Sequence, residues 1–190
     1  MNEIFLWKQL LKGEDYAYTY FYKTYVDIMY SYGLKFTPDG ELVKDCIHDV
    51  FVKIYANRKK LGMTDNARRY LLAALKNTLF NHFQKNVETY NIDCVEPVFD
   101  LDYNAEEQII TDKENHQQAK ELDNMLNQLT FRQKEALYYR YNEGMKIGDI
   151  CILMQMNYQS VQNLLQRSIN KLRRSVERGE KVNLKLLKKI

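Results

Sequence analysis

The stretch Met145–Arg174 constrains the fold more than any other part of this chain. Apolar or small residues recur there at the i, i+3, i+4, i+7 spacing of a helix face, on both sides of a short polar interruption. The interruption ends at Asn157, a residue type favoured at helix N-caps. The stretch therefore predicts two helices joined by a tight turn, which is a helix-turn-helix. The two faces comprise Ile147, Ile150, Cys151 and Met154, and then Val161, Leu164, Leu165, Ser168, Ile169 and Leu172.

The polar face of the second of these helices carries side chains suited to DNA. Gln, Asn and Arg can form paired hydrogen bonds with base edges, and the second helix of a helix-turn-helix can lie in the major groove. Arg173 and Arg174 add positive charge for phosphates. A helical hairpin whose polar face meets only water is the alternative. The candidate DNA contacts are Gln159, Ser160, Gln162, Asn163, Gln166, Arg167 and Lys171.

Charge is unevenly distributed along the 190 residues, although the formal net charge is only +3. Residues 58–86 hold seven Lys and Arg against one acid, and residues 160–190 hold nine against two. Between them, residues 93–123 hold ten Asp and Glu against two Lys. This pattern predicts two surfaces for anionic partners and an acidic connector that avoids both, although an acidic connector can also simply be solvated.

Periodicity predicts four helices in the N-terminal half, over residues 4–11, 14–36, 41–57 and from about 66 to Lys85, the last capped by Thr64 or Asp65. Aromatic residues at helical spacing in the second helix indicate a core. The third helix has a continuous apolar stripe from Leu42 to Tyr55. Its exposed side is predicted to carry Asp45, His48, Asp49 and Lys53.

The fourth helix combines an apolar stripe from Tyr70 to Phe83, which includes His82, with a polar and basic outer face. Basic residues interleaved with aromatic ones, here Tyr70 and Phe80, suit single-stranded or melted DNA, because charges follow phosphates and rings stack on bases. A solvated basic face over a packed core is the alternative. The candidates are Arg68, Arg69, Lys76, Asn77, Asn81, Gln84 and Lys85.

Residues 86–104 lack a helical period and contain Pro97, which indicates a linker. A helix is predicted over residues 105–129, followed by another that opens with a capping box at Thr130–Gln133 and ends at Glu143-Gly144. The predicted fold is all-α, with two small helical domains joined by a flexible linker. The predicted boundaries are a first domain at 1–86, an acidic linker at 87–108, a helix-turn-helix domain at 109–178 and a basic tail at 179–190.

No familiar catalytic or cofactor motif occurs in the sequence. Glycine-rich phosphate-binding loops and the HExxH zinc motif are absent, and the three histidines are dispersed. The three cysteines are far apart and indicate a reducing compartment. No apolar run reaches membrane-spanning length, and the N-terminus does not resemble a signal peptide. We therefore expect a cytoplasmic protein that is not an enzyme and has no metal, no cofactor and no small-molecule substrate.

Three segments, in their order and spacing, resemble the sigma-70 family of bacterial RNA polymerase initiation factors, and the extracytoplasmic-function type fits best. The segments are Asp45–Tyr55, Tyr70–Lys85 and Leu129–Leu172. The resemblance implies a sigma-2-like helical bundle followed by a sigma-4-like helix-turn-helix. The chain departs from the family pattern in several places. Gln155 replaces the usual turn Gly, and Gly148 and Asp149 replace the usual acidic pair before Ile150. His48, Asn81, Gln84, Gln162 and Asn163 also replace residues more usual in the family. If Gln155 is left-handed, it costs roughly 1 kcal/mol.

The resemblance also implies partners and roles. The exposed side of the 41–57 helix would bind the clamp of core RNA polymerase, and the fourth helix would contact the −10 promoter element. Residues 158–171 would recognise the −35 element, and the linker would thread toward the active-site and RNA-exit channels. An anti-sigma factor, which a membrane can anchor, is the usual regulator. Two alternatives are a stand-alone helix-turn-helix regulator and a diverged helical module that binds an anti-sigma factor as a decoy.

Overall fold

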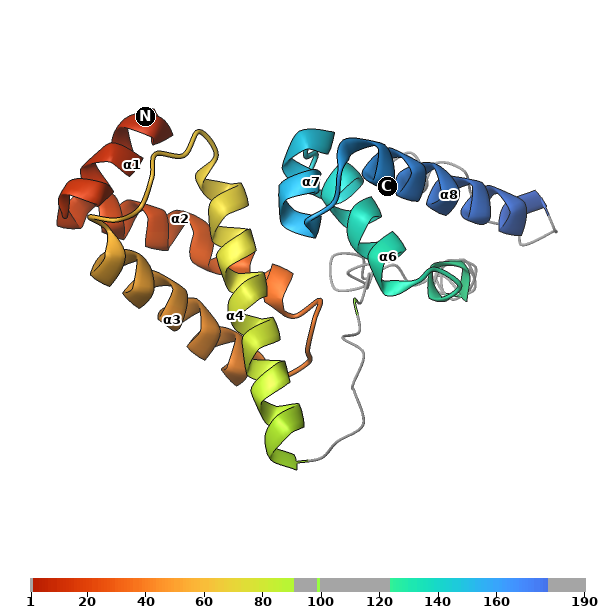
Figure 1. Cartoon of the computed structure of the whole chain (residues 1–190), viewed down its shortest axis with the longest axis horizontal. Coiled ribbons are helices and arrows are strands. Elements are labelled where there is room, and N and C mark those ends of the chain that lie inside the picture. The colour runs from red at the N-terminus through yellow and green to blue at the C-terminus, as the bar shows by residue number, and fades with distance from the viewer. Residues whose placement is uncertain (1, 91–98, 100–123, 178–190) are drawn as a thin grey trace, which may run out of the picture. The chain divides into compact units, whose positions relative to one another are not determined.

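A computed structural model of the chain describes residues 2–90, 99 and 124–177. All regular secondary structure among these residues is helical (Figure 1). The chain divides into two compact units, Met1–Val98 and Phe99–Ile190. The two-domain, all-α fold predicted from the sequence is confirmed. Within the described residues, no helix is both long and apolar enough to cross a membrane.

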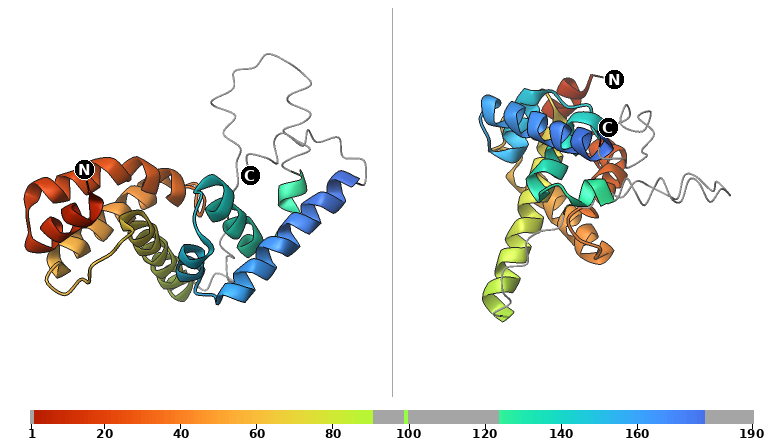
Figure 2. Two further views of the ribbon diagram at one scale, coloured as in Figure 1. Left: turned by 90° about the horizontal axis from the view of Figure 1, so that it is seen from above. Right: turned by 90° about the vertical axis from the view of Figure 1, so that its right-hand side faces the viewer.

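The first unit is a bundle of four helices. These are α1 (Glu3–Lys12), α2 (Asp15–Gly33), α3 (Gly40–Asn57) and α4 (Ala67–Tyr90). Helices α2, α3 and α4 all pack against one another, and α1 packs on α2 and α4 (Figure 2). The predicted helices are confirmed, but α4 continues past Lys85 to Tyr90, where the sequence had suggested the start of an irregular linker.

Short polar residues fix where the helices of the first unit begin. Asp39 accepts hydrogen bonds from the backbone N–H groups of Glu41 and Leu42 at the start of α3. At the start of α4, Asn66 Oδ1 accepts from the N–H of Arg69 at 2.9 Å. The prediction of Thr64 or Asp65 as this cap is wrong, because Thr64 Oγ1 instead accepts from the N–H of Asn66, one step earlier in the turn.

Aromatic packing holds the first unit together. Trp7, buried on α1, lies edge-on to Phe21 of α2 and Tyr70 of α4, with ring centroids 5.5 and 5.0 Å apart. Its indole N–H donates to the carbonyl oxygen of Gly62 at 3.1 Å. One residue therefore ties α1 to two helices and to the loop before α4. This confirms that the aromatic stripe of α2 belongs to the core, where Phe21, Tyr25, Met29 and Tyr32 are buried.

The second unit contains a helical segment at residues 124–127, α6 (Phe131–Leu137), the π-helix η2 (Tyr138–Asn142), α7 (Ile147–Met154) and α8 (Tyr158–Glu177). Its core lies where α8 packs on α6 and α7. Buried apolar residues come from every element: Met125, Leu126, Leu129, Ala136, Leu137, Ile150, Leu153, Met154, Val161, Leu165 and Leu172. Figure 2 shows α8 as one long helix.

The helix that opens at Thr130 has the predicted start and an unexpected end. Thr130 and Gln133 form the capping box, with both reciprocal hydrogen bonds present. The last turn, however, is a π-helix in which the N–H of Glu143 donates to the carbonyl oxygen of Tyr138. The wider turn accommodates the adjacent buried side chains of Tyr138 and Tyr139 before Gly144, whose φ of +61° lets the chain leave the helix.

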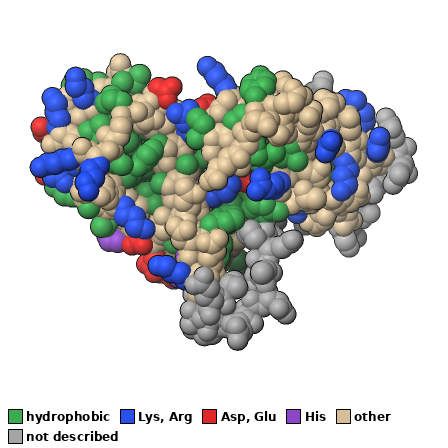
Figure 3. Space-filling view, in the orientation of Figure 1, with side chains coloured by type: hydrophobic (Ala, Val, Ile, Leu, Met, Phe, Trp, Pro, Cys, Tyr) green, Lys and Arg blue, Asp and Glu red, His purple; other side chains and the backbone are tan. Residues whose placement is uncertain are grey.

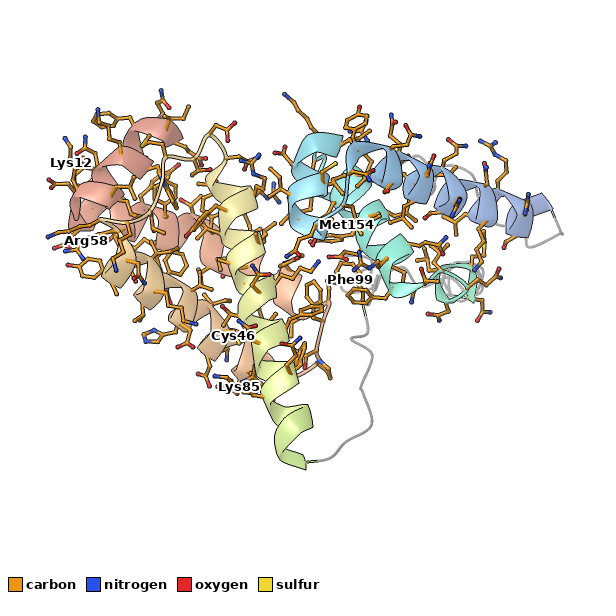
Figure 4. All side chains as sticks on the ribbon, viewed as in Figure 1. Lys12, Cys46, Arg58, Lys85, Phe99 and Met154 are labelled. Carbon is orange, nitrogen blue, oxygen red and sulfur yellow. The ribbon has the colours of Figure 1, made fainter. Side chains whose placement is uncertain are left out.

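Phe99, which the sequence assigned to the linker, is buried in the second unit. Its ring lies edge-on to Phe131 and Tyr138, with centroids 5.8 and 5.5 Å apart (Figure 4). The available sequence signal was a bulky aromatic residue in an otherwise acidic stretch. The other predicted linker residues after 90, the predicted helix before residue 124 and the tail at 179–190 lie outside the described residues.

Two glycines in helices should respond oppositely to alanine. A Cβ on Gly33 would lie 2.5 Å from Val43 Cγ1, where α2 meets α3, whereas nothing lies within 4 Å of a Cβ on Gly148. We expect Gly33→Ala to lower the free energy of unfolding of the first unit by about 1–3 kcal/mol through overpacking. Gly148→Ala should raise that of the second unit by about 0.5–1 kcal/mol, because alanine favours helix.

These effects can be separated by two optical signals during urea unfolding. Trp7 is the single tryptophan of the chain, so its fluorescence follows the first unit, while circular dichroism follows both. Gly33→Ala should shift the fluorescence midpoint downward. Gly148→Ala should leave that midpoint in place and raise the dichroism midpoint of the second unit; the reverse pattern would contradict the packing described above.

Candidate nucleic-acid interface

The turn between α7 and α8 has the geometry of a helix-turn-helix. Gln155 ends α7 in the left-handed conformation, at φ 52° and ψ 46°, and the N–H of Met156 bonds back to the carbonyl oxygen of Cys151. Asn157 then caps α8, because its Oδ1 accepts from the N–H of Ser160 at 2.8 Å. The predicted turn and N-cap are confirmed, and Gln155 is the left-handed residue whose cost was considered above.

Packing of α7 on α8 fixes which face of α8 remains exposed. Ile150, Leu153 and Met154 are buried on α7, and Val161 and Leu165 are buried on α8. Leu153 was missing from the predicted face of α7, while Ile147 and Cys151, which were on it, are only half-buried. Ser168 fits the apolar side of α8 because its hydroxyl donates to the carbonyl oxygen of Leu164 at 2.7 Å.

The opposite face of α8 presents the predicted DNA-contact side chains to solvent, with Ser160 half-buried and the others exposed. Gln159 Nε2 donates to Asn163 Oδ1 at 3.1 Å, one helical turn apart. Lys171 donates to the carbonyl oxygen of Gln128. Gln162 and Arg167 bond to none of the described residues. In the view of Figure 3, the surface of this unit is predominantly basic where it is charged.

The predicted −10 face of α4 is only partly free. Asn77, Asn81, Gln84 and Lys85 are exposed. The two arginines at the start of the helix are half-buried, and Arg69 forms an ion pair with Asp65 at 3.0 Å. Among the residues of α4 whose side chains are described, the exposed ones of this face therefore lie between Asn77 and Lys85 (Lys85 is labelled in Figure 4).

The aromatic side chains near the −10 face are packed within the protein. Tyr70 lies against Trp7, and burial raises the pKa of its phenol. Phe80 is half-buried beside Phe36 and Phe83, with Lys76 Nζ 5.7 Å from its ring centroid. His82, placed in the apolar stripe by the sequence, is exposed, whereas the buried Leu72 was missed.

One side of α3 exposes acidic and apolar groups together. Asp45, His48, Asp49 and Lys53 are all exposed as predicted, and Lys53 lies 3.8 Å from the Asp49 carboxylate. Behind them, burial raises the pKa of the Cys46 thiol, and the nearby Asp49 and Asp45 carboxylates raise it further. A thiol with a raised pKa is a poor nucleophile, so Cys46 acts as a packing residue.

Sequence reasoning missed two side chains on this face of α3. Tyr55 was assigned to the apolar stripe but is 42% exposed, and Val52 is 47% exposed. The Arg58 guanidinium lies over the Tyr55 ring, 4.3 Å from its centroid (Figure 4). Among the described residues, no group of His, Cys, Asp and Glu side chains could hold a metal ion.

Two family models match the sequence of this chain. The model described as Sigma-70 region 2 matches residues 21–89, and the model described as Sigma-70, region 4 matches residues 119–172. Together they cover more than half of the chain. The chain belongs to the sigma-70 family. It is a transcription initiation factor whose partners are core RNA polymerase and promoter DNA.

Solved structures support this fold for the sigma factor. CnrH, in complex with the cytosolic domain of CnrY, superposes with a TM-score of 0.61 over 94% of this chain and 99% of that chain, at 13% identity. RpoE of Bartonella quintana, in complex with the anti-sigma factor NepR, gives a TM-score of 0.55 over 82% and 94%, at 16% identity. No curated protein matches the sequence.

The left-handed turn residue leads to a test of the helix-turn-helix of this sigma factor. Gln155→Gly should raise the free energy of unfolding of the second unit by about 0.5–1 kcal/mol, since glycine adopts positive φ without the steric cost that glutamine bears. Gln155→Ala is the control, because it removes the exposed side chain but keeps the strain. Urea unfolding followed by circular dichroism should separate the two; equal midpoints would contradict strain at this residue.

Proposed function

We propose that the sigma factor contacts its partners through three surfaces on separate helices. The exposed face of α8 recognises the −35 element, the exposed face of α4 contacts the −10 element, and the outer side of α3 binds the polymerase clamp. The helix-turn-helix of α7 and α8 is the observation that carries this proposal, because its packing leaves an uninterrupted polar face on the second helix.

The −35 role is supported by the chemistry available on α8. Gln162 and Arg167 are exposed and bond to none of the described residues, so neither must break an internal hydrogen bond to meet a base. Gln and Arg can each contact a base edge through two hydrogen bonds. The Gln159–Asn163 hydrogen bond holds two further amides in place at the start of the helix.

The −10 role is supported by the exposed residues of α4 between Asn77 and Lys85. Asn77, Asn81 and Gln84 follow one another at helical spacing and are exposed, with Lys85 beside them. Amides can hydrogen bond to exposed base edges, and a neighbouring lysine can bind a backbone phosphate. Since the Tyr70 and Phe80 rings are packed internally, we propose that this face works by hydrogen bonds rather than by ring stacking.

The clamp role is supported by the mixed character of the outer side of α3. Asp45 and Asp49 would repel DNA phosphates, so this surface suits a protein partner. Val52 and Tyr55 add exposed apolar area beside the carboxylates, as in the cores of protein interfaces. We propose that both belong to the polymerase-binding surface with His48 and Lys53.

We also propose that an anti-sigma factor regulates this chain in the cytoplasm and that the chain has no catalytic activity of its own. The supporting observation is that structures of similar fold were determined in complexes, one with the anti-sigma factor NepR and one with the cytosolic domain of CnrY. Purification of the chain from its native cells, followed by identification of stoichiometric partners, tests this.

The central experiment combines co-elution with core RNA polymerase and transcription in vitro from the DNA upstream of the chain's own gene. Co-elution and a promoter-specific transcript are expected. Tight sequence-specific DNA binding by the free chain without co-elution would favour a stand-alone regulator. Binding to another protein, without promoter-specific transcription and without DNA binding by the free chain, would favour a decoy module.

Reversal of charge on α3 tests the clamp surface. Asp49→Lys should weaken binding to core polymerase by about tenfold or more, because it places a cation in a surface matched to the opposite sign. Its ion pair with Lys53 is exposed and contributes little to folding, so stability should hold. Asp27→Lys, an exposed residue of α2, is the control of equal charge change. Equal affinities of the two variants would remove this side of α3 from the interface.

Truncation on α8 tests promoter recognition. Gln162→Ala and Arg167→Ala should each weaken holoenzyme binding to the preferred −35 sequence by about 1–3 kcal/mol. The difference in affinity between the preferred and the altered −35 sequences should become smaller. Arg132→Ala, an exposed arginine at the start of α6, removes the same charge elsewhere. Competition binding with a panel of −35 variants is the measurement. An unchanged ranking of sequences in both α8 variants would show that another surface recognises the element.

A further inference from the structure

A polar pocket of about 440 Å³ lies in the second unit, beside the C-terminal half of α8. Arg167, Lys171 and Arg174 line it, spaced i, i+4 and i+7 on the helix. The opposite side is formed by Gln128 and by Gln133 of α6, with Asn170 and Ser175 completing the lining. All seven described residues that line this pocket are polar or basic.

The three amides of the pocket all have their oxygen atoms occupied. Gln133 Oε1 accepts from the N–H of Thr130 at 3.0 Å in the capping box. Gln128 Oε1 accepts from the Ser175 hydroxyl at 3.0 Å, and Asn170 Oδ1 accepts from Gln166 at 3.2 Å. Each oxygen thus has one of its two lone pairs in use, whereas the NH₂ group of each amide donates to none of the described residues and remains available to a ligand.

The charge of the cations of the pocket is not compensated by any described residue. Arg167, Lys171 and Arg174 are exposed, and none of them forms an ion pair with a described residue. Lys171 is held in place by its bond to the carbonyl oxygen of Gln128, which neutralises no charge. Three cations and three amide NH₂ groups thus surround one open volume. Such a set of donors matches an anion with several oxygen atoms, such as a phosphate.

We infer that this pocket binds a backbone phosphate of promoter DNA beside the −35 element. The inference rests on the proposed placement of α8 on that element. DNA is favoured over an acidic protein, because protein interfaces have apolar cores whereas protein–DNA interfaces are polar and strongly positive. The pocket also shares Arg167 with the recognition face, so a duplex contacting that face lies next to it.

The site adds Gln128 and Gln133 to the expected DNA contacts, and it makes Lys171 and Arg174 positioning groups on one phosphate. Phosphate contacts fix the register of a protein on the duplex but carry no sequence information. Loss of one of them should therefore weaken binding to all sequences alike. Binding should also release one counterion fewer. The slope of the logarithm of the binding constant against the logarithm of salt concentration should therefore become less negative by about 0.9.

Adjacent arginines provide a matched test. The sequence suggested both for phosphates and both are exposed, but only Arg174 lines the pocket, so we expect Arg173 not to contact this phosphate. Holoenzymes carrying Arg174→Gln or Arg173→Gln are titrated with promoter duplex from about 50 to about 200 mM salt. The affinity ratio of wild type to Arg174→Gln should fall about threefold over this range. The ratio for Arg173→Gln should stay nearly constant, and −35 preference should be unchanged in both.

A second variant guards against a folding effect. Gln133→Glu preserves the capping box, in which Glu and Gln serve equally, but places a carboxylate in the pocket. Promoter affinity at low salt should fall several-fold while the thermal unfolding midpoint is not lowered. A merely structural role for Gln133 predicts that affinity and midpoint change together or not at all.

Each contrary result has a definite meaning. Equal salt dependence of the Arg174 and Arg173 variants would overturn the phosphate site. So would weakened binding of Arg174→Gln to core polymerase without DNA, which would assign the pocket to an acidic protein surface. If the wild-type holoenzyme shows no −35 preference, the proposed role of α8 fails, and the salt dependence of the two variants on non-specific duplex still tests the phosphate site.

Discussion

The three-residue turn between α7 and α8 is the constraint on which the second unit depends. Gln155 accepts a left-handed backbone, and Asn157 caps the next helix immediately afterwards. With so short a connection, α8 can bury Val161 and Leu165 against α7 in only one rotational setting. That setting decides which side chains of α8 face water, and therefore which ones are available to DNA. The strained residue is thus the origin of the recognition surface, although it need not contact DNA itself.

The two kinds of partner proposed for this sigma factor are matched by two kinds of surface. The outer side of α3 combines carboxylates with exposed Val52 and Tyr55, which suits a protein. The predicted DNA-contact face of α8 and the adjoining pocket combine amides with cations, and the residues named for both are all polar or charged, which suits DNA. The two surfaces differ in whether exposed apolar side chains lie beside the charged ones. This difference matters because a positively charged surface could bind either an acidic protein or a nucleic acid.

Helical periodicity predicted most of the fold, because each helix buries a stripe that is visible in its own sequence. The capping box at Thr130 and the turn before α8 were equally local. What the sequence could not predict depends on partners distant in the chain. Phe99 is buried because its ring packs against those of Phe131 and Tyr138. Tyr70 is packed because its ring lies against Trp7. The pocket beside α8 joins residues some forty positions apart, so no local pattern could announce it.

The pocket also shows how hydrogen bonds that stabilise a fold can set the chemistry of a surface. A glutamine side chain is both donor and acceptor, and by itself indicates neither a cationic nor an anionic ligand. In the capping box, the oxygen of Gln133 is held by the N–H of Thr130, and the Ser175 hydroxyl holds that of Gln128 in the same way. Each oxygen then has one of its two lone pairs in use, while the NH₂ group donates to none of the described residues. The bonds that begin one helix and tie down the end of another thereby favour an anion, and the cations of α8 supply the charge to hold it.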